Sequence, residues 1–164
     1  MDGNDSGVTL RPAVPGDAAE VAEIWYRGWC DGHLGFVPDE LASARTEGSF
    51  LTRAAERVGD TTVAEVQGRV AGFIMVVDDE VKQVYVLADH RGTGVAGVLL
   101  SEAERQVRDG GYAKAWLAVV AGNARARRFY NRSGWSDRGE FDYAASSKDG
   151  PIIVPSHRYE KDVI

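Results

Sequence analysis

The residues best suited to chemistry lie in the stretch RGTGVAG, from Arg91 to Gly97. Gly92, Gly94 and Gly97 have no side chains to cover the backbone, and they lie between the apolar run EVKQVYVLA and a helix-like run. The first amides of a helix have no partner within the helix, and the helix dipole favours negative charge beside them. Arg91 adds a cation that can pair with phosphate. A plain strand-to-helix turn would need only one glycine, so the stretch predicts an anion site.

Two well-known phosphate-binding patterns do not fit this stretch. Residues 92–97 satisfy G-x-G-x-x-G, the dinucleotide pattern, but that pattern also needs an acidic residue about 20 positions later to hold a ribose. The sequence there reads LAVVAGN, which contains no carboxylate. The P-loop is excluded because no Gly-Lys-Ser or Gly-Lys-Thr follows the glycines. The anion is therefore neither a dinucleotide bound in the usual way nor a P-loop nucleotide.

Composition indicates a globular chain of one domain. The chain has 164 residues, of which 44% are hydrophobic and 27% charged, as in soluble domains. No apolar run is long enough to cross a bilayer, and the polar residues 1–7 predict a loose tail before a single domain at 8–164. Cys30 is the only cysteine, which excludes an internal disulfide and favours the cytoplasm. The net charge of −6 argues against a general nucleic-acid binder.

Hydrophobic periodicity and turn residues predict the elements that must position the loop. Strands are predicted at 8–12, on both sides of a turn at 67–68 within 61–77, and at 80–88, 113–120, 135–143 and 152–162. Helices are predicted at 16–29, as one or two short segments within 37–58, and at 94–111 and 123–135. Asp17 with Glu20 fits a capping box, and Asn123 can cap the last helix. This order predicts an α+β fold around a mixed central sheet.

At Arg91 the sequence resembles the GNAT acyltransferases, whose pyrophosphate loop reads Gln/Arg-x-x-Gly-x-Gly/Ala after the fourth strand. Arg91, Gly94 and Ala96 match that loop, and the segment NARARRFYNRSGW at 123–135 is similar to the family's later motif. Both motifs stand in the family's order, so the resemblance covers nearly the whole chain. It implies a mixed, mostly antiparallel sheet of about seven strands flanked by helices, with splayed fourth and fifth strands.

The resemblance implies acetyl-CoA as co-substrate, no metal, and direct transfer of an acetyl group to a primary amine. It implies that the pantetheine lies between the splayed strands and that the cofactor is bound by Val84, Val86, Arg91, Gly92, Thr93, Gly94, Val95, Ala96, Gly97, Asn123 and Tyr130. Arg125, Arg127 and Arg128 could attract its phosphates or could form a solvated helix face.

Catalysis requires a deprotonated acceptor amine, a hydrogen-bond donor to the thioester oxygen and a general acid for the leaving thiolate. By resemblance, the Val86 N–H polarises the thioester carbonyl and Tyr130 reaches the thiol. Glu80 is the candidate base, because it stands six residues before Val86 and shares its face if the strand is regular. His33, His157 and water alone remain alternatives to Glu80.

The acceptor is expected beside the aromatic segment 25–40, which the family places along the acceptor cleft. The candidate acceptor residues are Tyr26, Trp29, His33 and Phe36, with packing as the alternative role. A small-molecule amine is favoured. Ala118 stands where the ribosomal-protein N-terminal acetyltransferases carry glutamate, which argues against transfer of their mechanism and substrate. A protein N-terminus or lysine as acceptor, and a non-catalytic acyl-CoA-binding module, are the alternatives. Neither nucleic acid nor membrane is expected as a partner, and a homodimer is left open.

Overall fold

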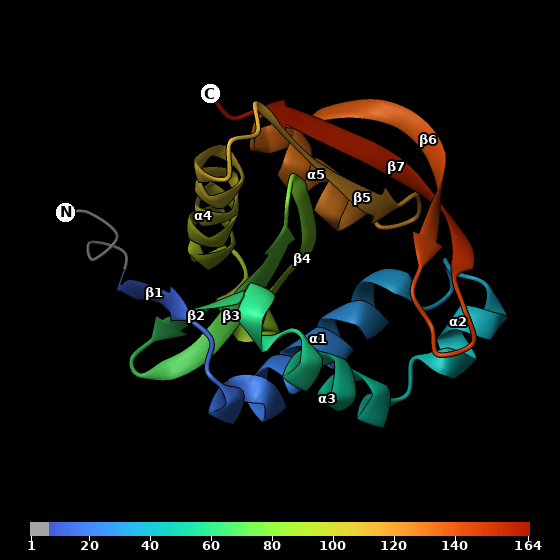
Figure 1. The fold of residues 1–164 in the computed structure, drawn as a ribbon, viewed down its shortest axis with the longest axis horizontal. Coiled ribbons are helices and arrows are strands. Elements are labelled where there is room, and N and C mark those ends of the chain that lie inside the picture. The colour runs from blue at the N-terminus through green and yellow to red at the C-terminus, as the bar shows by residue number, and fades with distance from the viewer. Residues whose placement is uncertain (1–6) are drawn as a thin grey trace.

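The computed structural model describes residues 7–164, in which seven strands form one sheet in the order β1-β2-β3-β4-β5-β7-β6 (Figure 1). All neighbouring strands are antiparallel except β4 and β5, which run parallel. The predicted α+β fold with a mixed, mostly antiparallel sheet is confirmed. The tail expected at 1–7 lies, apart from Gly7, outside the described residues. The strands are β1 (Val8–Pro12), β2 (Thr61–Val66), β3 (Arg69–Val77), β4 (Glu80–Val86), β5 (Lys114–Val120), β6 (Ser136–Ala145) and β7 (Ile152–Asp162).

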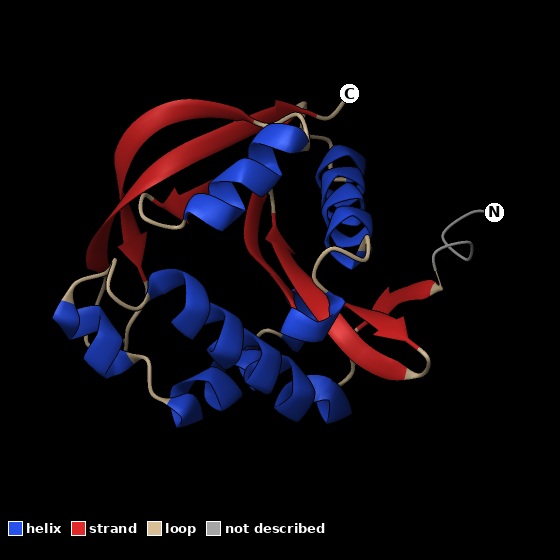
Figure 2. Cartoon of the chain, turned by 180° about the vertical axis from the view of Figure 1, so that it is seen from behind, coloured by secondary structure: helices blue, strands red, loops and turns tan. Residues whose placement is uncertain are grey.

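Helices cover both faces of the sheet (Figures 1 and 2). One hydrophobic core joins α4 and α5 to the sheet, and a second core joins α1, α2 and α3 to its other face. None of the helices in the described part of the chain is long and apolar enough to cross a membrane. The helices are α1 (Ala18–His33), α2 (Asp39–Ala44), α3 (Glu47–Glu56), α4 (Val95–Asp109) and α5 (Ala124–Arg132), with 3-10 turns η2 (Pro15–Asp17), η3 (Val58–Asp60) and η4 (Ala88–His90).

The sheet opens between β4 and β5. The two strands pair only at Glu80 and Trp116, near the start of β4. Beyond that pair, Lys82 is an extra residue in β4, since Val81 faces Val76 while Gln83 faces Met75 on β3. A bulge of this kind bends a strand and increases its twist. The predicted splay of the fourth and fifth strands is therefore present, and the bulge accounts for it.

Helix α1 runs further than the sequence predicts. The sequence predicts a helix over 16–29, yet the helix continues through Gly28 and Gly32 to His33. A Cβ on Gly28 would overlap the ring of Tyr85, and one on Gly32 would lie 2.6 Å from Asn123 Nδ2. The two glycines let a β4 side chain and the cap of α5 approach α1 closely.

The two predicted helix caps have different outcomes. Asn123 Oδ1 accepts a hydrogen bond from the Ala126 N–H at 3.2 Å, as expected of a cap. Asp17 makes no capping bond to α1, so the predicted capping box is wrong. Its carboxylate instead accepts bonds from Arg11 at 2.8 and 2.9 Å and from the Val14 N–H at 2.8 Å. The η2 turn precedes α1 and directs Asp17 toward β1.

Candidate active site

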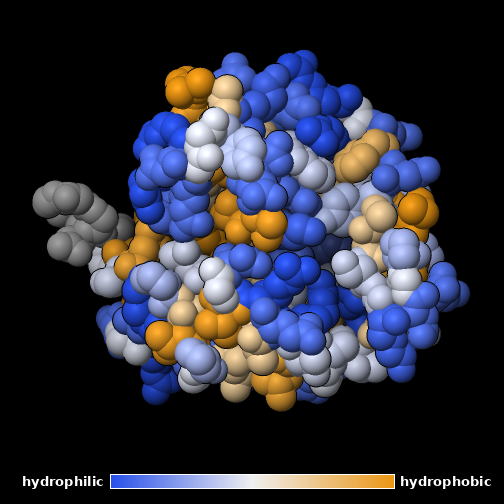
Figure 3. Space-filling view, in the orientation of Figure 1, coloured by the Kyte–Doolittle hydropathy of each residue, from blue (hydrophilic) through white to orange (hydrophobic). Residues whose placement is uncertain are grey.

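A cavity of about 950 Å³ extends from the gap between β4 and β5 to the helices α1, α2 and α3. Its walls also include residues of α5 and of the loop between β6 and β7. Figure 3 shows a hollow on this face of the molecule, bordered largely by hydrophilic residues. The cavity therefore joins the strand gap to a space wide enough for a second small molecule.

The glycine loop has the geometry of an open anion cradle. Gly92 and Gly94 have φ of +79° and +95°, values that favour glycine. The Val98 N–H makes the first helical bond of α4, to Gly94 O at 3.1 Å, so the amides of residues 95–97 precede the helical ladder. No heavy atom of the described residues lies within 4 Å of where a Cβ on Gly92, Gly94 or Gly97 would stand. A ligand can thus reach these amides directly.

Three arginines gather beside this loop. Arg91 forms an ion pair with Asp31 of α1 at 2.9 Å. Burial lowers the pKa of Arg125, the nearby charges of Arg91 and Arg128 lower it further, and Asp31 opposes them. Arg125 of α5 therefore lies near both Arg91 and Arg128. These cations complement an anion at the loop.

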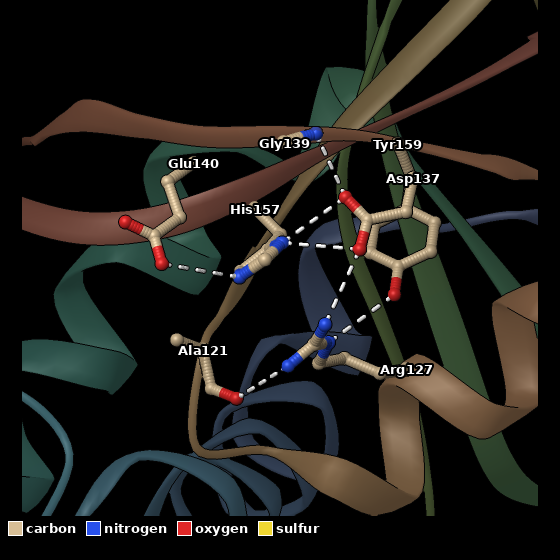
Figure 4. Close-up of polar contacts among 7 residues, drawn as sticks. All are labelled: Ala121, Arg127, Asp137, Gly139, Glu140, His157 and Tyr159. Atoms are coloured by element: carbon tan, nitrogen blue, oxygen red, sulfur yellow. Dashed lines mark hydrogen bonds and ion pairs between the residues drawn. The ribbon is translucent and has the colours of Figure 1, made fainter.

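Arg127 and His157 have a different role, shown in Figure 4. Arg127 donates to Ala121 O at 3.1 Å, to the Asp137 carboxylate at 3.2 Å and to the Tyr159 hydroxyl at 3.3 Å. His157 Nδ1 lies 3.0 Å from the same carboxylate. This network ties α5 to β6 and β7. Neither Arg127 nor His157 lines the cavity, so His157 does not act there as the base.

Removing the charge at the centre of that network should loosen α5. Asp137→Asn is expected to lower the free energy of unfolding by about 1 kcal/mol, because it weakens charge-assisted bonds that are only partly shielded from water. Urea denaturation followed by circular dichroism would measure the change. Asp142→Asn, on the exposed side of β6, is the matched control. Equal stability of the two variants would show that the network contributes nothing.

The gap between β4 and β5 exposes backbone amides of β4. The Leu87 N–H donates to Ala71 O on β3 at 2.8 Å. Because amide directions alternate along a strand, the N–H groups of Val84 and Val86 point away from β3 and into the gap. No pairing of β5 with this part of β4 is present among the described residues. The N–H of Val86, the predicted donor to a thioester oxygen, therefore faces the open gap.

Tyr130 reaches the same gap from α5. Its residue surface is only 8% exposed, it packs against Trp135 and Tyr159, and it lines the cavity. Burial raises the pKa of Tyr130 above its ordinary value, so the hydroxyl keeps its proton at neutral pH. Burial likewise raises the pKa of Tyr85 on β4, and Tyr130 raises it further, so the two tyrosines are neighbours. Tyr85 was not among the predicted site residues.

Comparison with known proteins agrees with this arrangement. Residues 22–135 match the profile described as the Acetyltransferase (GNAT) family. The chain belongs to the GNAT family. An uncharacterized N-acetyltransferase of Mycobacterium tuberculosis is 32% identical over 109 residues, which cover 63% of this chain and 67% of the relative. The protein is thus an acetyltransferase enzyme.

Two solved structures share the fold of this GNAT. The PaiA N-acetyltransferase of Thermoplasma acidophilum, solved with coenzyme A, has a TM-score of 0.73 at 17% identity and covers 94% of this chain and 98% of its own. YncA of Salmonella typhimurium, solved with acetyl-CoA, has a TM-score of 0.69 at 19% identity and covers 96% of this chain and 94% of its own. Both similarities confirm the fold predicted from the two motifs.

Glu80 of the GNAT lies in the cavity but not on the face that the sequence suggests. Val81, Val84 and Val86 all contact the α4 core, so alternation along β4 breaks between Val81 and Val84. Glu80, the neighbour of Val81, consequently faces the α1 side, as Tyr85 does. The bulge causes this change of face. The Glu80 carboxylate accepts a hydrogen bond from the Tyr143 hydroxyl at 2.7 Å and lies 3.6 Å from Lys82 Nζ.

Of the four predicted acceptor residues, Trp29 and His33 line the large cavity, where their rings stack at 5.3 Å. Tyr26 and Phe36 do not. Tyr26 is turned by about 100° from Trp25 around the helix and borders a separate cavity of about 330 Å³. Phe36 lies beyond the end of α1, where its ring covers Gly122.

His33 is unsuited to act as a base. Burial lowers its pKa from 6.5 to about 4, so the ring is neutral at physiological pH and binds protons weakly. Between pH 6.5 and about 4, His33 is protonated in the unfolded chain but stays neutral in the folded protein. Stability linked to His33 is therefore fully present above pH 6.5 and is lost as the pH falls toward 4.

A pH series can test this burial. Acidification from pH 7.5 to 4.5 should cost the wild type about 2–3 kcal/mol of unfolding free energy through His33, as measured by urea denaturation. His33→Phe keeps a ring against Trp29 and should flatten that dependence, whereas His90→Asn should retain it. An unchanged slope in His33→Phe would place the titrating group elsewhere.

Three further cavity residues were missed by the sequence reasoning. Arg45 follows α2 and donates from Nη2 to Ser146 O at 2.6 Å, in the loop between β6 and β7. The Arg53 guanidinium of α3 lies over the Trp25 ring, 4.3 Å from its centroid. Tyr143 of β6 is the partner of Glu80. All three come from segments without motifs, and only the fold brings them to the cavity.

Proposed function

We propose that this GNAT transfers an acetyl group from acetyl-CoA directly to the primary amine of a small molecule. The open amides of residues 95–97 and the arginines beside them suit the pyrophosphate, since helix N-termini favour bound phosphate. The amides of Val84 and Val86 suit the pantetheine in the strand gap. Acetyl-CoA supplies the acyl group as a thioester when it binds.

Each site residue has a role in this proposal. The Val86 N–H donates to the thioester oxygen as negative charge develops there. Tyr130, protonated because it is buried, donates its proton to the departing thiolate. Asn123 holds the start of α5 and thereby places Tyr130. Glu80 accepts the proton of the acceptor amine through water, and Tyr143 orients its carboxylate.

The hydrogen bond between Arg45 and Ser146 is the observation that favours a small molecule over a peptide as the acceptor. This bond, 2.6 Å long, joins the end of α2 to the loop between β6 and β7 across the acceptor side of the cavity. Figure 1 shows the hairpin loop beside α2. An extended peptide would need a groove that stays open along its length. A cavity bridged in this way favours a compact molecule that enters whole.

Release of free thiol from acetyl-CoA tests the proposal. The purified protein would be assayed with amines, polyamines, aminoglycosides, amino acids and peptides, with Tyr130→Phe as the matched inactive variant. Turnover of a small amine above that variant's rate supports the proposal. Turnover of peptides alone would replace it with protein acetylation, and coenzyme A binding without any turnover would favour a non-catalytic module.

A further inference from the structure

Two arginines meet on the acceptor side of the cavity. Arg45 at the end of α2 and Arg53 on α3 both line it, together with Tyr85. The Arg45 charge lowers the pKa of Arg53, and both charges lower the pKa of Tyr85. The guanidinium groups therefore lie close to each other and to the tyrosine that borders the strand gap.

Neither arginine has an anionic partner within residues 7–164. The residue surface of Arg45 is only 7% exposed, and its recorded bond is to the Ser146 carbonyl. Arg53 Nη1 is buried without a hydrogen-bond partner, while the guanidinium stacks on Trp25. Glu80, the cavity carboxylate with a side chain only 13% exposed, is already engaged by Tyr143 and Lys82.

Such an arrangement is unfavourable for the protein alone. A buried cation loses its hydration and needs a counter-charge, and a second cation nearby adds repulsion. Burial, followed by the nearby charge of Arg45, lowers the pKa of Arg53 to about 10. Buried charges without partners at a cavity wall are typical of sites that bind a ligand of opposite charge.

We propose that Arg45 and Arg53 bind an oxyanion of the acceptor, so that the substrate is a small amine that also carries a carboxylate or a phosphorus oxyanion. This inference rests on the proposed acetyl transfer. Guanidinium groups bind carboxylates and phosphonates through paired hydrogen bonds. One face of the Trp25 ring supports the Arg53 guanidinium and holds its donors in place.

The position of Tyr85 limits the distance between the two ends of the acceptor. The charges of Arg45, Arg53 and Tyr130 all act on the Tyr85 hydroxyl, so all three side chains lie near it. The anion site and the transfer site therefore border the same tyrosine. An amine a few bonds from its oxyanion, as in an amino acid or an aminoalkylphosphonate, can reach both.

Matched substrates and variants test the inference. Thiol release would be measured for common L-amino acids, their carboxamides, their decarboxylated amines and the phosphonate analogues of four of them. Enzymes would be wild type, Arg45→Gln, Arg53→Gln and the control Arg108→Gln on the exposed side of α4. For the preferred side chain, kcat/KM should be at least about tenfold higher with an oxyanion than without one. The carboxylate and phosphonate series distinguish the two oxyanions.

The variants should lose this preference. Arg45→Gln and Arg53→Gln are each expected to raise the acceptor KM by about 10- to 100-fold, with little change in acetyl-CoA affinity, whereas Arg108→Gln should behave as wild type. The Tm of unliganded Arg53→Gln should stay equal or rise, because an unpaired buried charge is removed. Neutral amines that match or exceed their anionic counterparts, or a preference that survives both substitutions, would overturn the inference.

A binding measurement separates this inference from the proposed function. If no acceptor is acetylated, the proposed transfer fails, but the anion site is still testable through the tryptophan fluorescence of the protein, because Trp25 and Trp29 line the cavity. Titration with L-leucine and its phosphonate analogue, in the presence of coenzyme A, should change the emission of wild type but not of Arg53→Gln. L-leucinamide should have no effect. No response to either oxyanion would overturn the anion site itself.

Discussion

Turnover of Tyr130→Phe is expected to fall by about 100-fold or more, with acetyl-CoA affinity nearly unchanged. The substitution removes one oxygen atom and keeps the ring that packs against Trp135 and Tyr159. In the described part of the chain no hydrogen bond is recorded for the Tyr130 hydroxyl. Its removal should therefore cost little stability and should act mainly on the departing thiolate.

Steady-state kinetics, calorimetry with acetyl-CoA and thermal unfolding together measure this effect. Tyr112→Phe is the matched control, because Tyr112 is 38% exposed and distant from the cavity lining. Unchanged turnover in Tyr130→Phe would remove its role as the acid. Tyr85, which also borders the cavity, would then be the acid to test by the same substitution.

The geometry of the glycine loop and of the α5 cap could be predicted because local rules govern it. A positive φ selects glycine at Gly92 and Gly94, and the start of a helix leaves its amides free. Asn123 likewise caps α5 through a contact three residues away. Such features lie within a few residues of one another, so their spacing is visible in the sequence.

The wall of the cavity formed by α2 and α3 could not be predicted in the same way, because it depends on contacts between distant segments. Arg45 and Arg53 lie on short helices without a motif, and charged residues in such helices are usually solvated. The burial of Arg45 and the partial burial of Arg53 follow from the packing of α2 and α3 against the β6–β7 loop and Trp25. The two glycines inside α1 were a partial signal, since a glycine inside a helix often marks a close approach, here of Tyr85 to Gly28 and of Asn123 to Gly32.

The face of β4 on which Glu80 lies was predicted wrongly because the backbone of this strand is irregular. Strict alternation would put Glu80 on the face of Val86, but the bulge at Lys82 inserts one residue and reverses the face. A bulge of one residue is not visible in the sequence here, because polar and apolar residues occur both before and after Lys82. The same bulge opens the strand gap, so the feature that misled the prediction also creates the site.

Gly97→Glu should abolish measurable acetyl-CoA binding while making the folded protein more stable. Gly97 has an ordinary helical conformation, and a Cβ there would meet no heavy atom of the described residues within 4 Å. Any other residue should therefore favour α4, by about 0.5–1 kcal/mol relative to glycine, and a carboxylate in the first turn also suits the helix dipole. In the binding site, the same carboxylate would stand where the pyrophosphate must approach.

Gly97→Ala and Gly97→Gln separate the causes of that loss. Alanine adds only a methyl group, glutamine adds the bulk of glutamate, and glutamate adds bulk and charge. We expect the Tm of all three to equal or exceed that of wild type, while the Kd for acetyl-CoA rises in the order alanine, glutamine, glutamate and reaches at least about 100-fold for glutamate. Calorimetry and thermal unfolding measure the two quantities independently. A folded Gly97→Glu protein with wild-type affinity would show that the pyrophosphate binds elsewhere, because no physical effect could leave a phosphate on these amides undisturbed by a carboxylate in the same turn.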